Sequence, residues 1–216
     1  MARKKLNILI TAGGTREYID PVRYISNASS GRMGCAIARA AVRAGHAVTL
    51  ITAPTSLKPP KDANVIRVVT CDDMFRAVRR EFAGCDCLVM AAAVSDYKPA
   101  VMSKTKIKKE QSVLSLHLKP TRDILAWAGR NKKKGQMLVG FALEDKKLLE
   151  NAEKKLKAKN LDMIVANEPD AIASDKLTVH IKSLKHDWIT YENISKTISA
   201  NRIVSMIQTF PIFHLE

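Results

Sequence analysis

The sequence contains few aromatic residues and no long apolar run. Phe, Trp and Tyr make up 5% of its 216 residues, and no Arg/Lys cluster alternates with aromatic residues as it does in a stacking platform for single-stranded nucleic acid. No apolar stretch reaches the roughly 18 residues of a membrane-spanning helix. The first residues lead directly into a predicted strand rather than a signal peptide. We therefore expect a soluble cytoplasmic protein that binds neither nucleic acid nor membrane.

Patterns typical of metal sites and of several enzyme classes are also missing. Cys35, Cys71, Cys85 and Cys87 have no zinc-type spacing and the five histidines are scattered, so we expect reduced thiols and no metal held by the protein. No glycine is followed by lysine, which excludes a P-loop. No Gly-x-Ser-x-Gly elbow precedes an acid and a histidine, which excludes that hydrolase class.

Acidic residues are a minority of the charged side chains. Lys and Arg number 36 and Asp and Glu 21, giving a net charge of +15. This excess suits nucleic acid, a membrane surface or small phosphorylated substrates equally well, so charge alone does not choose among them. The lysines gather at 104–109, 132–134, 146–147 and 154–159, where solvated helix faces explain most of them.

Short apolar runs alternate with helical patterns, which is typical of βαβ units and a parallel sheet. The runs that predict strands buried on both faces are Leu6–Thr11, Ala47–Thr52, Val65–Thr70, Cys87–Ala92, Leu138–Ala142 and Met163–Ala166. The predicted helices are Ser30–Gly45, Asp73–Phe82, Arg122–Arg130 with Thr121 as N-cap, and Lys146–Lys159. We predict one α/β domain over residues 1–216, Rossmann-like and doubly wound with a mainly parallel sheet.

Two segments leave this alternation. Residues 105–118 show a period of two, which predicts a β-arm outside the parallel sheet. The alternating side chains are Leu114, Leu116 and Leu118 on one side and Ser115 and His117 on the other. Near the end of the chain, Leu177–Leu184 and Trp188–Tyr191 predict a β-hairpin, and a helix is expected from Ser195 to Gln208.

The segment SSGRMG opens the first predicted helix and suits an anion. Ser29, Ser30 and Gly31 offer two hydroxyls, flexible backbone and the positive end of a helix. A serine that only caps the helix, followed by a glycine that only allows close helix packing, explains the same residues equally well. The glycine pair Gly13 and Gly14 follows the first strand directly, but a long loop separates it from SSGRMG.

That loop, GGTREYIDPVRYISN, brings Arg16, Arg23 and Asn27 to the carboxyl ends of the strands, where such sheets bind ligands. Long ordered loops in compact domains are usually functional.

Two further motifs point to the same edge of the sheet. In AAAVSDYKP, the small Ala91 and Ala92 let a flat ring lie against the backbone, and Asp96 can accept hydrogen bonds from a base or ribose. A tightly packed strand end with a turn at Asp96 is the alternative. In TKIKK, Lys106 and Lys108 share one side of the arm, where a mobile lysine would stabilise charge on a transferring phosphorus. A charged edge that prevents aggregation is equally consistent.

An NADP-binding oxidoreductase is the first alternative, since the fold is shared. Its G-x-G-x-x-G turn between first strand and first helix is absent, and LITAPTS supplies no acid to hold a ribose at the end of the second strand. No tyrosine precedes a lysine by four residues, as the short-chain dehydrogenases require. A basic nucleic-acid-binding module is the other alternative and rests on charge alone.

Five motifs in order resemble the phosphopantothenate-cysteine ligases of coenzyme A biosynthesis, from about Ile8 to Gln208. They are ITAGGTREYIDPVRYISNASSGRMG, AAAVSDYKP, KIKK, GFALE and AEKKLKAKNLDMIVAN. The resemblance implies an acyl-cytidylate made from 4'-phosphopantothenate and CTP, with release of pyrophosphate and then displacement of CMP by L-cysteine. It also implies Mg²⁺ with the nucleotide, no flavin and a homodimer. The residues leave CTP and ATP both open.

In bacteria this family is usually fused to a flavin-dependent decarboxylase. Few residues precede Leu6, so we expect a free-standing ligase or a separated domain, with a separate decarboxylase as a possible partner.

The resemblance also implies roles for particular residues. Asn27 and Arg23 match residues that hold the acyl intermediate, and Lys106 matches the catalytic lysine of the arm. The implied nucleotide contacts are Gly13, Gly14, Ser29, Ser30, Gly31, Ala91, Ala92, Asp96, Lys106, Asp123, Phe141, Lys155 and Lys159. The chain departs from the family pattern at Ala28, where arginine is frequent, at Arg122, where proline is common, and at Leu143, where alanine is usual.

Overall fold

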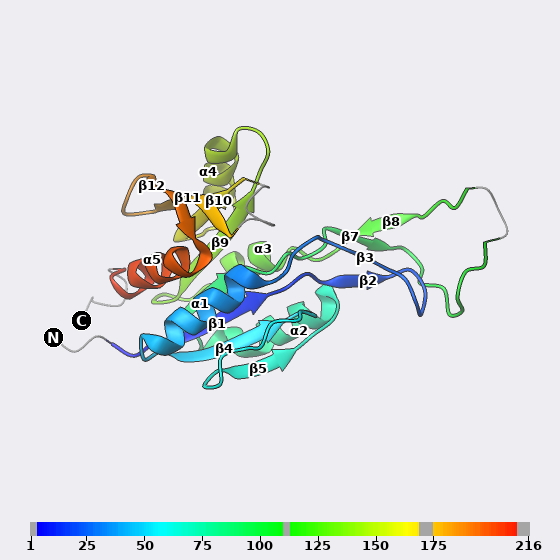
Figure 1. Ribbon diagram of the computed structural model, residues 1–216, viewed down its shortest axis with the longest axis horizontal. Coiled ribbons are helices and arrows are strands. Elements are labelled where there is room, and N and C mark those ends of the chain that lie inside the picture. Colours follow the sequence, from blue (N-terminus) through cyan, green and yellow to red (C-terminus); the bar gives the residue numbers. More distant parts are fainter. Residues whose placement is uncertain (1–3, 110–112, 169–174, 211–216) are drawn as a thin grey trace.

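The computed structural model describes residues 4–109, 113–168 and 175–210. Its centre is an eight-stranded sheet with the order β12-β11-β10-β9-β6-β1-β4-β5 (Figure 1). The parallel strands are β1 (Asn7–Ala12), β4 (Ala47–Thr52), β5 (Asn64–Arg67), β6 (Cys87–Met90), β9 (Met137–Leu143) and β10 (Met163–Asn167). The antiparallel β11 (Lys176–Ser183) and β12 (Ile189–Ser195) extend one edge. The predicted Rossmann-like, mainly parallel α/β fold is confirmed.

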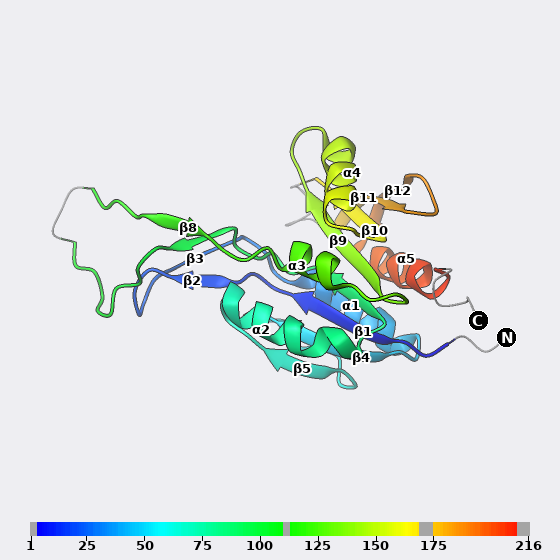
Figure 2. The ribbon, with the colours of Figure 1, turned by 180° about the vertical axis from the view of Figure 1, so that it is seen from behind.

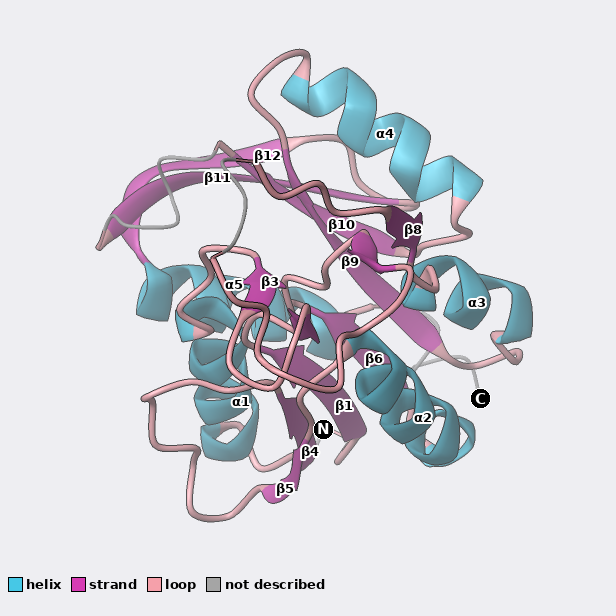
Figure 3. Cartoon of the chain, turned by 90° about the vertical axis from the view of Figure 1, so that its right-hand side faces the viewer, coloured by secondary structure: helices cyan, strands magenta, loops and turns pink. Residues whose placement is uncertain are grey.

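Helices cover both faces of this sheet (Figure 3). The helices α1 (Arg32–Arg43) and α5 (Lys196–Gln208) pack on one face. On the other face lie α2 (Cys71–Glu81), α3 (Ile124–Asn131) and α4 (Leu148–Ala158), with a short 3₁₀ turn, η1 (Phe82–Gly84), after α2. Successive residues of β1 alternate between the two layers, since Ile8 and Ile10 face α1 and Leu9 faces α2. Burial on both faces explains why the strands read as continuous apolar runs.

Several element boundaries differ from the predicted ones. β5 spans Asn64–Arg67 rather than Val65–Thr70, because Thr70 instead caps α2 through a capping box with Asp73. The N-cap of α3 is Asp123, whose carboxylate accepts the N–H of Ala126 at 2.8 Å, so the prediction of Thr121 is wrong. Thr121 instead donates its hydroxyl to the carbonyl of Ser95 at 2.6 Å.

Other predicted features near the helix ends are confirmed. Gly45, just beyond α1, has φ 87°. The C-terminal hairpin and helix are also present as β11, β12 and α5.

All four cysteines are buried free thiols, and burial together with the charge of Asp86 raises the pKa of Cys85 to about 12.

Two antiparallel ribbons extend from the carboxyl edge of the sheet and form what we call the arm, residues 15–26 and 97–120 (Figures 1 and 2). The first ribbon pairs β2 (Arg16–Tyr18) with β3 (Tyr24–Ser26), within the segment that the sequence indicates only as a loop. The second pairs β7 (Tyr97–Pro99) with β8 (Leu118–Pro120).

The predicted strand over residues 105–118 is therefore wrong for most of its length. Only Leu118 lies in a strand, and the described residues 105–109 and 113–117 have no strand assignment; residues 110–112 lie outside the described part. The reason is that β7 supplies a partner only as far as Leu118, and a period of two does not form a ladder without a partner strand. Within the described ranges, no helix combines the length and apolarity that a bilayer crossing needs.

Candidate functional site

A crevice lies along the carboxyl ends of β6, β9 and β10 and consists of two adjoining cavities. The α1 cavity, of about 510 Å³, is bounded by the turn before α1 and the start of α5. The α3 cavity, of about 380 Å³, is bounded by the turn before α3 and by α4. The two share Ala92, Val94, Asp96, Phe141 and Lys155 in their linings. A ligand that spans both cavities must therefore pass these shared residues.

Most of the residues predicted for the site line this crevice. Those in the α1 cavity are Asn27, Ser29, Ser30, Gly31, Ala91, Ala92, Asp96, Phe141 and Lys155. The α3 cavity adds Asp123 and Lys159. Gly13, Gly14, Arg23 and Lys106 line neither cavity. The structure thus gathers residues from four of the five motifs, while the arm motif KIKK lies elsewhere.

Ala91 and Ala92 reach the crevice because β6 ends at Met90, two residues earlier than predicted. The N–H of Ala92 is then held by the hydroxyl of the buried Thr11, at 3.1 Å, and not by a strand partner. The small side chains leave the crevice floor flat at this point. The sequence indicates small residues here but not the end of the strand.

The glycine pair after β1 brings two backbone segments together beneath the crevice. Gly13 has φ 82°, and a Cβ on it would lie 2.8 Å from the carbonyl oxygen of Ala53. A Cβ on Gly31, which has φ 76°, would lie 3.1 Å from the Cα of Gly13. A side chain on Gly13 would force the segment after β4 away, and one on Gly31 would force the turn before α1 away from the end of β1. Gly13 therefore acts on the crevice through packing.

Asn27 joins the loop before α1 to the segment after β6. Its side-chain amide donates to the carbonyl of Val94 at 3.1 Å, and the hydroxyl of Ser26 donates to the carbonyl of Thr15 at 2.7 Å. The hydroxyl of the buried Thr15 in turn accepts the N–H of Ser95 at 2.9 Å. These bonds fix Asn27 beside Asp96, and Thr15 and Ser95 are supporting residues that the sequence does not reveal.

The two lysines of α4 lie in different surroundings. Lys155 Nζ donates to the carbonyl of Phe141 at 2.7 Å. Burial, and then the positive charge of Lys159, lower the pKa of Lys155. Lys159 forms an ion pair with Asp123 at 2.8 Å, connecting α4 to the start of α3. Although burial raises the pKa of Asp123, hydrogen bonds from Lys159 and from the N–H of Ala126 lower it overall.

Arg23 and Lys106 lie on the arm and form one unit through Asp20. The Asp20 carboxylate is inaccessible to solvent and accepts from the Arg23 guanidinium at 2.6 Å and from the N–H of Ile107 at 3.1 Å. Arg23 also donates to the carbonyl of Ile107 at 2.6 Å. Both the N–H and the carbonyl of Ile107 are therefore hydrogen-bonded to the first ribbon. The side chain of the preceding Lys106 is exposed.

Four polar or charged residues line the α1 cavity without being among the predicted contacts: Arg32, Glu144, Asn167 and Lys196. The first three belong to the motifs SSGRMG, GFALE and AEKKLKAKNLDMIVAN, whereas Lys196, at the start of α5, lies outside every quoted motif. Only the fold brings these segments to one place.

The three departures from the family pattern all lie at the crevice. Ala28 and Leu143 line the α1 cavity, and Arg122 lines the α3 cavity. The Arg122 guanidinium lies 5.0 Å from the ring centroid of Phe75 and 3.9 Å from the Asp72 carboxylate. Asp123 still caps α3, so Arg122 does not disturb the backbone conformation that follows it.

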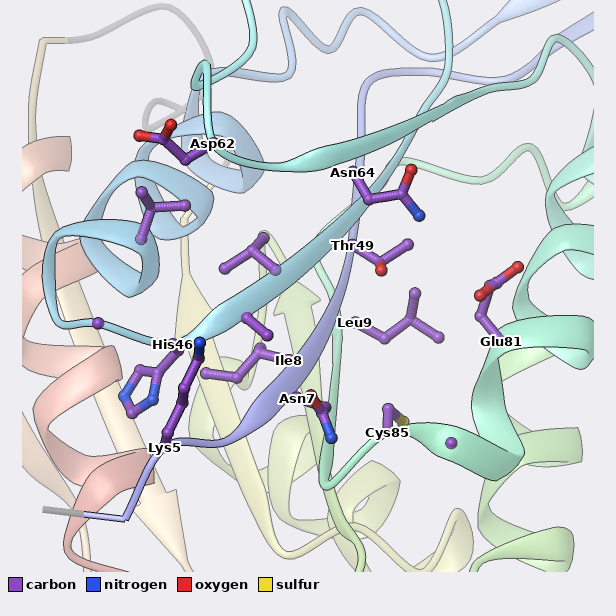
Figure 4. Close-up of a pocket in the computed structure, with 15 residues that line it drawn as sticks. Lys5, Asn7, Ile8, Leu9, His46, Thr49, Asp62, Asn64, Glu81 and Cys85 are labelled. Carbon is purple, nitrogen blue, oxygen red and sulfur yellow. The ribbon is translucent and has the colours of Figure 1, made fainter.

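Another cavity, of about 600 Å³, lies at the amino ends of β1 and β4 (Figure 4). Lys5 and His46 lie at one end of it and Glu81 and Cys85 at the other. The His46 Nδ1 accepts the N–H of Leu6 at 3.2 Å, and burial lowers the pKa of His46. None of the predicted site residues lines this cavity. Open α/β sheets bind ligands at the carboxyl ends of their strands, so we take the crevice and not this cavity as the site.

Metal ligands do not cluster in the described part of the chain. No three His, Cys, Asp or Glu side chains there are arranged to hold an ion.

The fold and the crevice define a Rossmann-like protein with a candidate ligand site at the carboxyl ends of a parallel sheet. The family model of the DNA/pantothenate metabolism flavoprotein C-terminal domain matches residues 3–210, and the chain belongs to this family.

Similar proteins include both curated relatives and a solved structure. The chain is 49% identical over 171 residues to a protein of an unknown prokaryotic organism named cysteine/cysteine sulfinic acid decarboxylase, with 77% of this chain and 48% of that protein covered. It is 48% identical over 166 residues to the coenzyme A biosynthesis bifunctional protein CoaBC of Bacillus subtilis (strain 168), with 76% and 41% covered. The chain thus spans less than half the length of these relatives.

A crystal structure of the C-terminal domain of CoaBC superposes with a TM-score of 0.82 and 37% identity, with 95% of each chain covered.

Proposed function

We propose that this chain is a phosphopantothenate-cysteine ligase that joins 4'-phosphopantothenate to L-cysteine through an acyl-cytidylate. The observation that carries the proposal is the crevice in which four separate motifs meet, with Asp96 and Lys155 lining both cavities and Asn27 lining the α1 cavity. The 37% identity to the CoaBC C-terminal domain over 95% of the chain supports it. A relative named as a decarboxylase matches with less than half of its own length, so we do not carry that name over to this chain.

In the first reaction, a carboxylate oxygen of 4'-phosphopantothenate attacks the α-phosphorus of CTP. The bond between the α-phosphorus and the bridging oxygen breaks, and pyrophosphate leaves with that oxygen. We assign the nucleoside to the α3 cavity, where Asp96 can accept hydrogen bonds and the Lys155 and Lys159 ammonium groups face the phosphates. Cationic groups around the transferring phosphorus stabilise the charge that develops there.

In the second reaction, the amine nitrogen of cysteine attacks the acyl carbon of the cytidylate. The amide bond forms, the bond from the acyl carbon to the CMP oxygen breaks, and the amine proton leaves to solvent. Asn27 lines the α1 cavity and donates to Val94, one of the residues that both cavities share, and we assign its amide to hold the acyl group for this attack. No electrons are transferred in either step, so the proposed reaction requires no flavin.

Magnesium fits this proposal as a companion of the nucleotide. The described side chains form no cluster of metal ligands, so the protein would not hold the ion by itself. Bound to the triphosphate, the ion would offset phosphate charge. Which nucleotide is preferred depends on backbone contacts to the base.

The arm supports the further proposal of a homodimer in which each arm reaches the crevice of the partner subunit. Lys106 lines neither cavity of its own chain, and the arm of a second copy would bring it to the crevice. The arm also exposes apolar side chains, with Val101 84%, Val113 70% and Leu114 55% exposed. Exposed apolar surface of this kind is typical of protein contacts. A decarboxylase, either as a separate chain or as part of a longer one, would consume the product.

The purified chain with Mg²⁺, 4'-phosphopantothenate, cysteine and either CTP or ATP tests the reaction. We expect pyrophosphate release to require the acid, and release of the nucleoside monophosphate to require both the acid and cysteine, with the amide product identified by mass. A lack of cysteine-dependent nucleoside monophosphate release with both nucleotides would remove the proposal.

Thermal protection separates the proposed function from the two alternatives. CTP at 100 times its Kd should stabilise the chain by roughly 2.7 kcal/mol, which raises Tm by several degrees. NADP and an oligonucleotide serve as the matched ligands for the oxidoreductase and the nucleic-acid-binding module. Protection by either of these instead of a nucleoside triphosphate would favour the corresponding alternative.

A further inference from the structure

Two cationic side chains line the α1 cavity but not the α3 cavity. Arg32 is the first residue of α1 and Lys196 is the first residue of α5, and both line this cavity. The two helices come from opposite ends of the chain and pack side by side on the same face of the sheet (Figure 1). This meeting of two positive charges is a product of the fold.

The charges around Lys196 differ from those around Lys155. Asp96, Asp123 and Glu144 all act on Lys155. Lys196 is influenced by Arg32 and Asp175: burial, and then the positive charge of Arg32, lower its pKa, whereas Asp175 raises it. The carboxylates of the crevice thus surround its middle, and its α1/α5 end is the positive one.

The ion pair between Arg32 and Asp175 does not prevent Arg32 from binding another anion. Arg32 Nη1 lies 2.9 Å from Asp175 Oδ1, but the Asp175 side chain is 93% exposed and that of Arg32 48% exposed. Ion pairs between exposed groups are weak and screened by salt. A phosphate offers more charge and matches the planar guanidinium in a bidentate fashion, so it competes well for Arg32.

We propose that Arg32 and Lys196 form a phosphate subsite at the α1/α5 end of the crevice. The inference rests on the proposed function and names the place of one substrate group. The acid carries its carboxylate at one end and its phosphate at the other. Its carboxylate has to meet the nucleotide where the cavities join, so its phosphate extends into the α1 cavity. The terminal phosphates of the nucleoside triphosphate are the other source of the same chemistry.

Titration calorimetry with substrate pairs that differ by phosphate tests the subsite. The pairs are 4'-phosphopantothenate with pantothenate, and CTP with CMP. Arg32→Ala and Lys196→Ala should each raise the Kd of 4'-phosphopantothenate by roughly tenfold or more and leave that of pantothenate unchanged. If the variants bind CTP more weakly but bind CMP as the parent chain does, the nucleotide is the source of the phosphate and the subsite stands. If the variants bind both 4'-phosphopantothenate and CTP as tightly as the parent chain does, the proposal is overturned.

Two further variants sharpen the comparison. Arg43→Ala removes a cation from the same helix pair, where Arg43 Nη2 donates to Asn201 Oδ1 at 3.2 Å, and it lines neither cavity. It should bind every ligand as the parent chain does. Asp175→Asn removes the competing carboxylate and should tighten binding of the phosphorylated ligand. Weaker binding in Asp175→Asn would contradict the assignment.

The outcome is separable from that of the ligase reaction. Calorimetry needs no turnover, so the subsite can stand even if no amide is formed. Conversely, amide formation with unchanged KM values in Lys196→Ala would refute the subsite and leave the ligase proposal intact.

Discussion

Two polar residues divide the proposed chemistry between them. Asn27 lies in the crevice, held by its 3.1 Å bond to the carbonyl of Val94, and Lys106 lies on the arm. We expect Lys106→Ala to lower formation of the cytidylate on the order of 10² to 10³-fold, because charge on the phosphorus is no longer stabilised. Asn27→Asp should form the cytidylate and accumulate it. Rapid quench with labelled CTP measures both.

The neighbouring Lys104, also exposed on the arm, provides the matched control for the lysine variant. Lys104→Ala should form the cytidylate at the parent rate. Equal accumulation of intermediate in the Asn27 and Lys106 variants would show that this division of roles is wrong.

The lowered pKa of Lys155 predicts a particular pH dependence. Burial and the charge of Lys159 favour the neutral amine, so Lys155 loses its proton at a lower pH than an ordinary lysine. Nucleotide affinity should therefore fall as the pH rises through this lowered pKa. Lys155→Arg keeps its charge and should hold its affinity to higher pH. Fluorescence titration across pH compares the two, and identical profiles would exclude Lys155 as a phosphate contact.

At the scale of residues, sequence motifs identify what is local. Asn27, Asp96 and Phe141 belong to motifs whose residue types already suggest a ligand site. In the structure all three line the α1 cavity. Lys196 has no such context, because one lysine at a helix start resembles any other until the fold brings α5 beside α1. Thr15 and Ser95 support the crevice through two buried hydrogen bonds that no sequence pattern indicates.

Among the elements, the arm depends on one buried carboxylate. Burial raises the pKa of Asp20, but hydrogen bonds from Arg23 and from the N–H groups of Val22, Arg23 and Ile107 outweigh it and hold the pKa well below its usual range. A lowered folded-state pKa means that this stabilisation is fully present above about pH 4 and is lost only as the pH falls through the folded value. The connection between the ribbons should persist in mild acid.

Asp20→Asn removes the charge and keeps the shape. We expect faster amide hydrogen exchange at Val22, Arg23 and Ile107, and a loss of cytidylate formation on the order of 10²-fold through misplacement of Lys106. The exposed Asp62 provides a matched control in Asp62→Asn. Unchanged exchange at Ile107 in the Asp20 variant would show that the carboxylate does not hold the arm.

Strands are predicted correctly from the sequence where burial on both faces imposes a continuous apolar pattern. The prediction fails where the presence of a partner strand decides whether a ladder forms. The six parallel strands read clearly because both their faces are covered. Leu114 and Leu116 show the period of a strand equally well, yet no ladder forms there because β7 ends opposite Leu118. The end of β6 at Met90 is likewise set by Thr11, which takes the N–H of Ala92.

For the whole molecule, the proposed assembly makes a sharp prediction. If each crevice is completed by the arm of the partner subunit, an Asn27→Asp chain and a Lys106→Ala chain form mixed dimers with one intact site. Mixing the two inactive proteins should restore activity to about a quarter of the sites by random pairing. Sedimentation of the parent chain should show a dimer at micromolar concentration. No recovery on mixing would mean that each chain completes its own crevice or that the arm has another role.

The net charge of +15 shows what composition leaves open at this scale. The net charge does not indicate that three carboxylates influence Lys155, whereas the positive charge of Arg32 influences Lys196. Only the positions of the side chains separate the middle of the crevice from its end.

The start of β1 and the end of α5 lie together at the edge of the sheet opposite the arm (Figures 1 and 2). A tag, surface anchor or fused protein attached at either side of the described chain would therefore stand clear of both the crevice and the ribbons. Catalytic neighbours can be appended to this scaffold without obstructing the entry of its substrates.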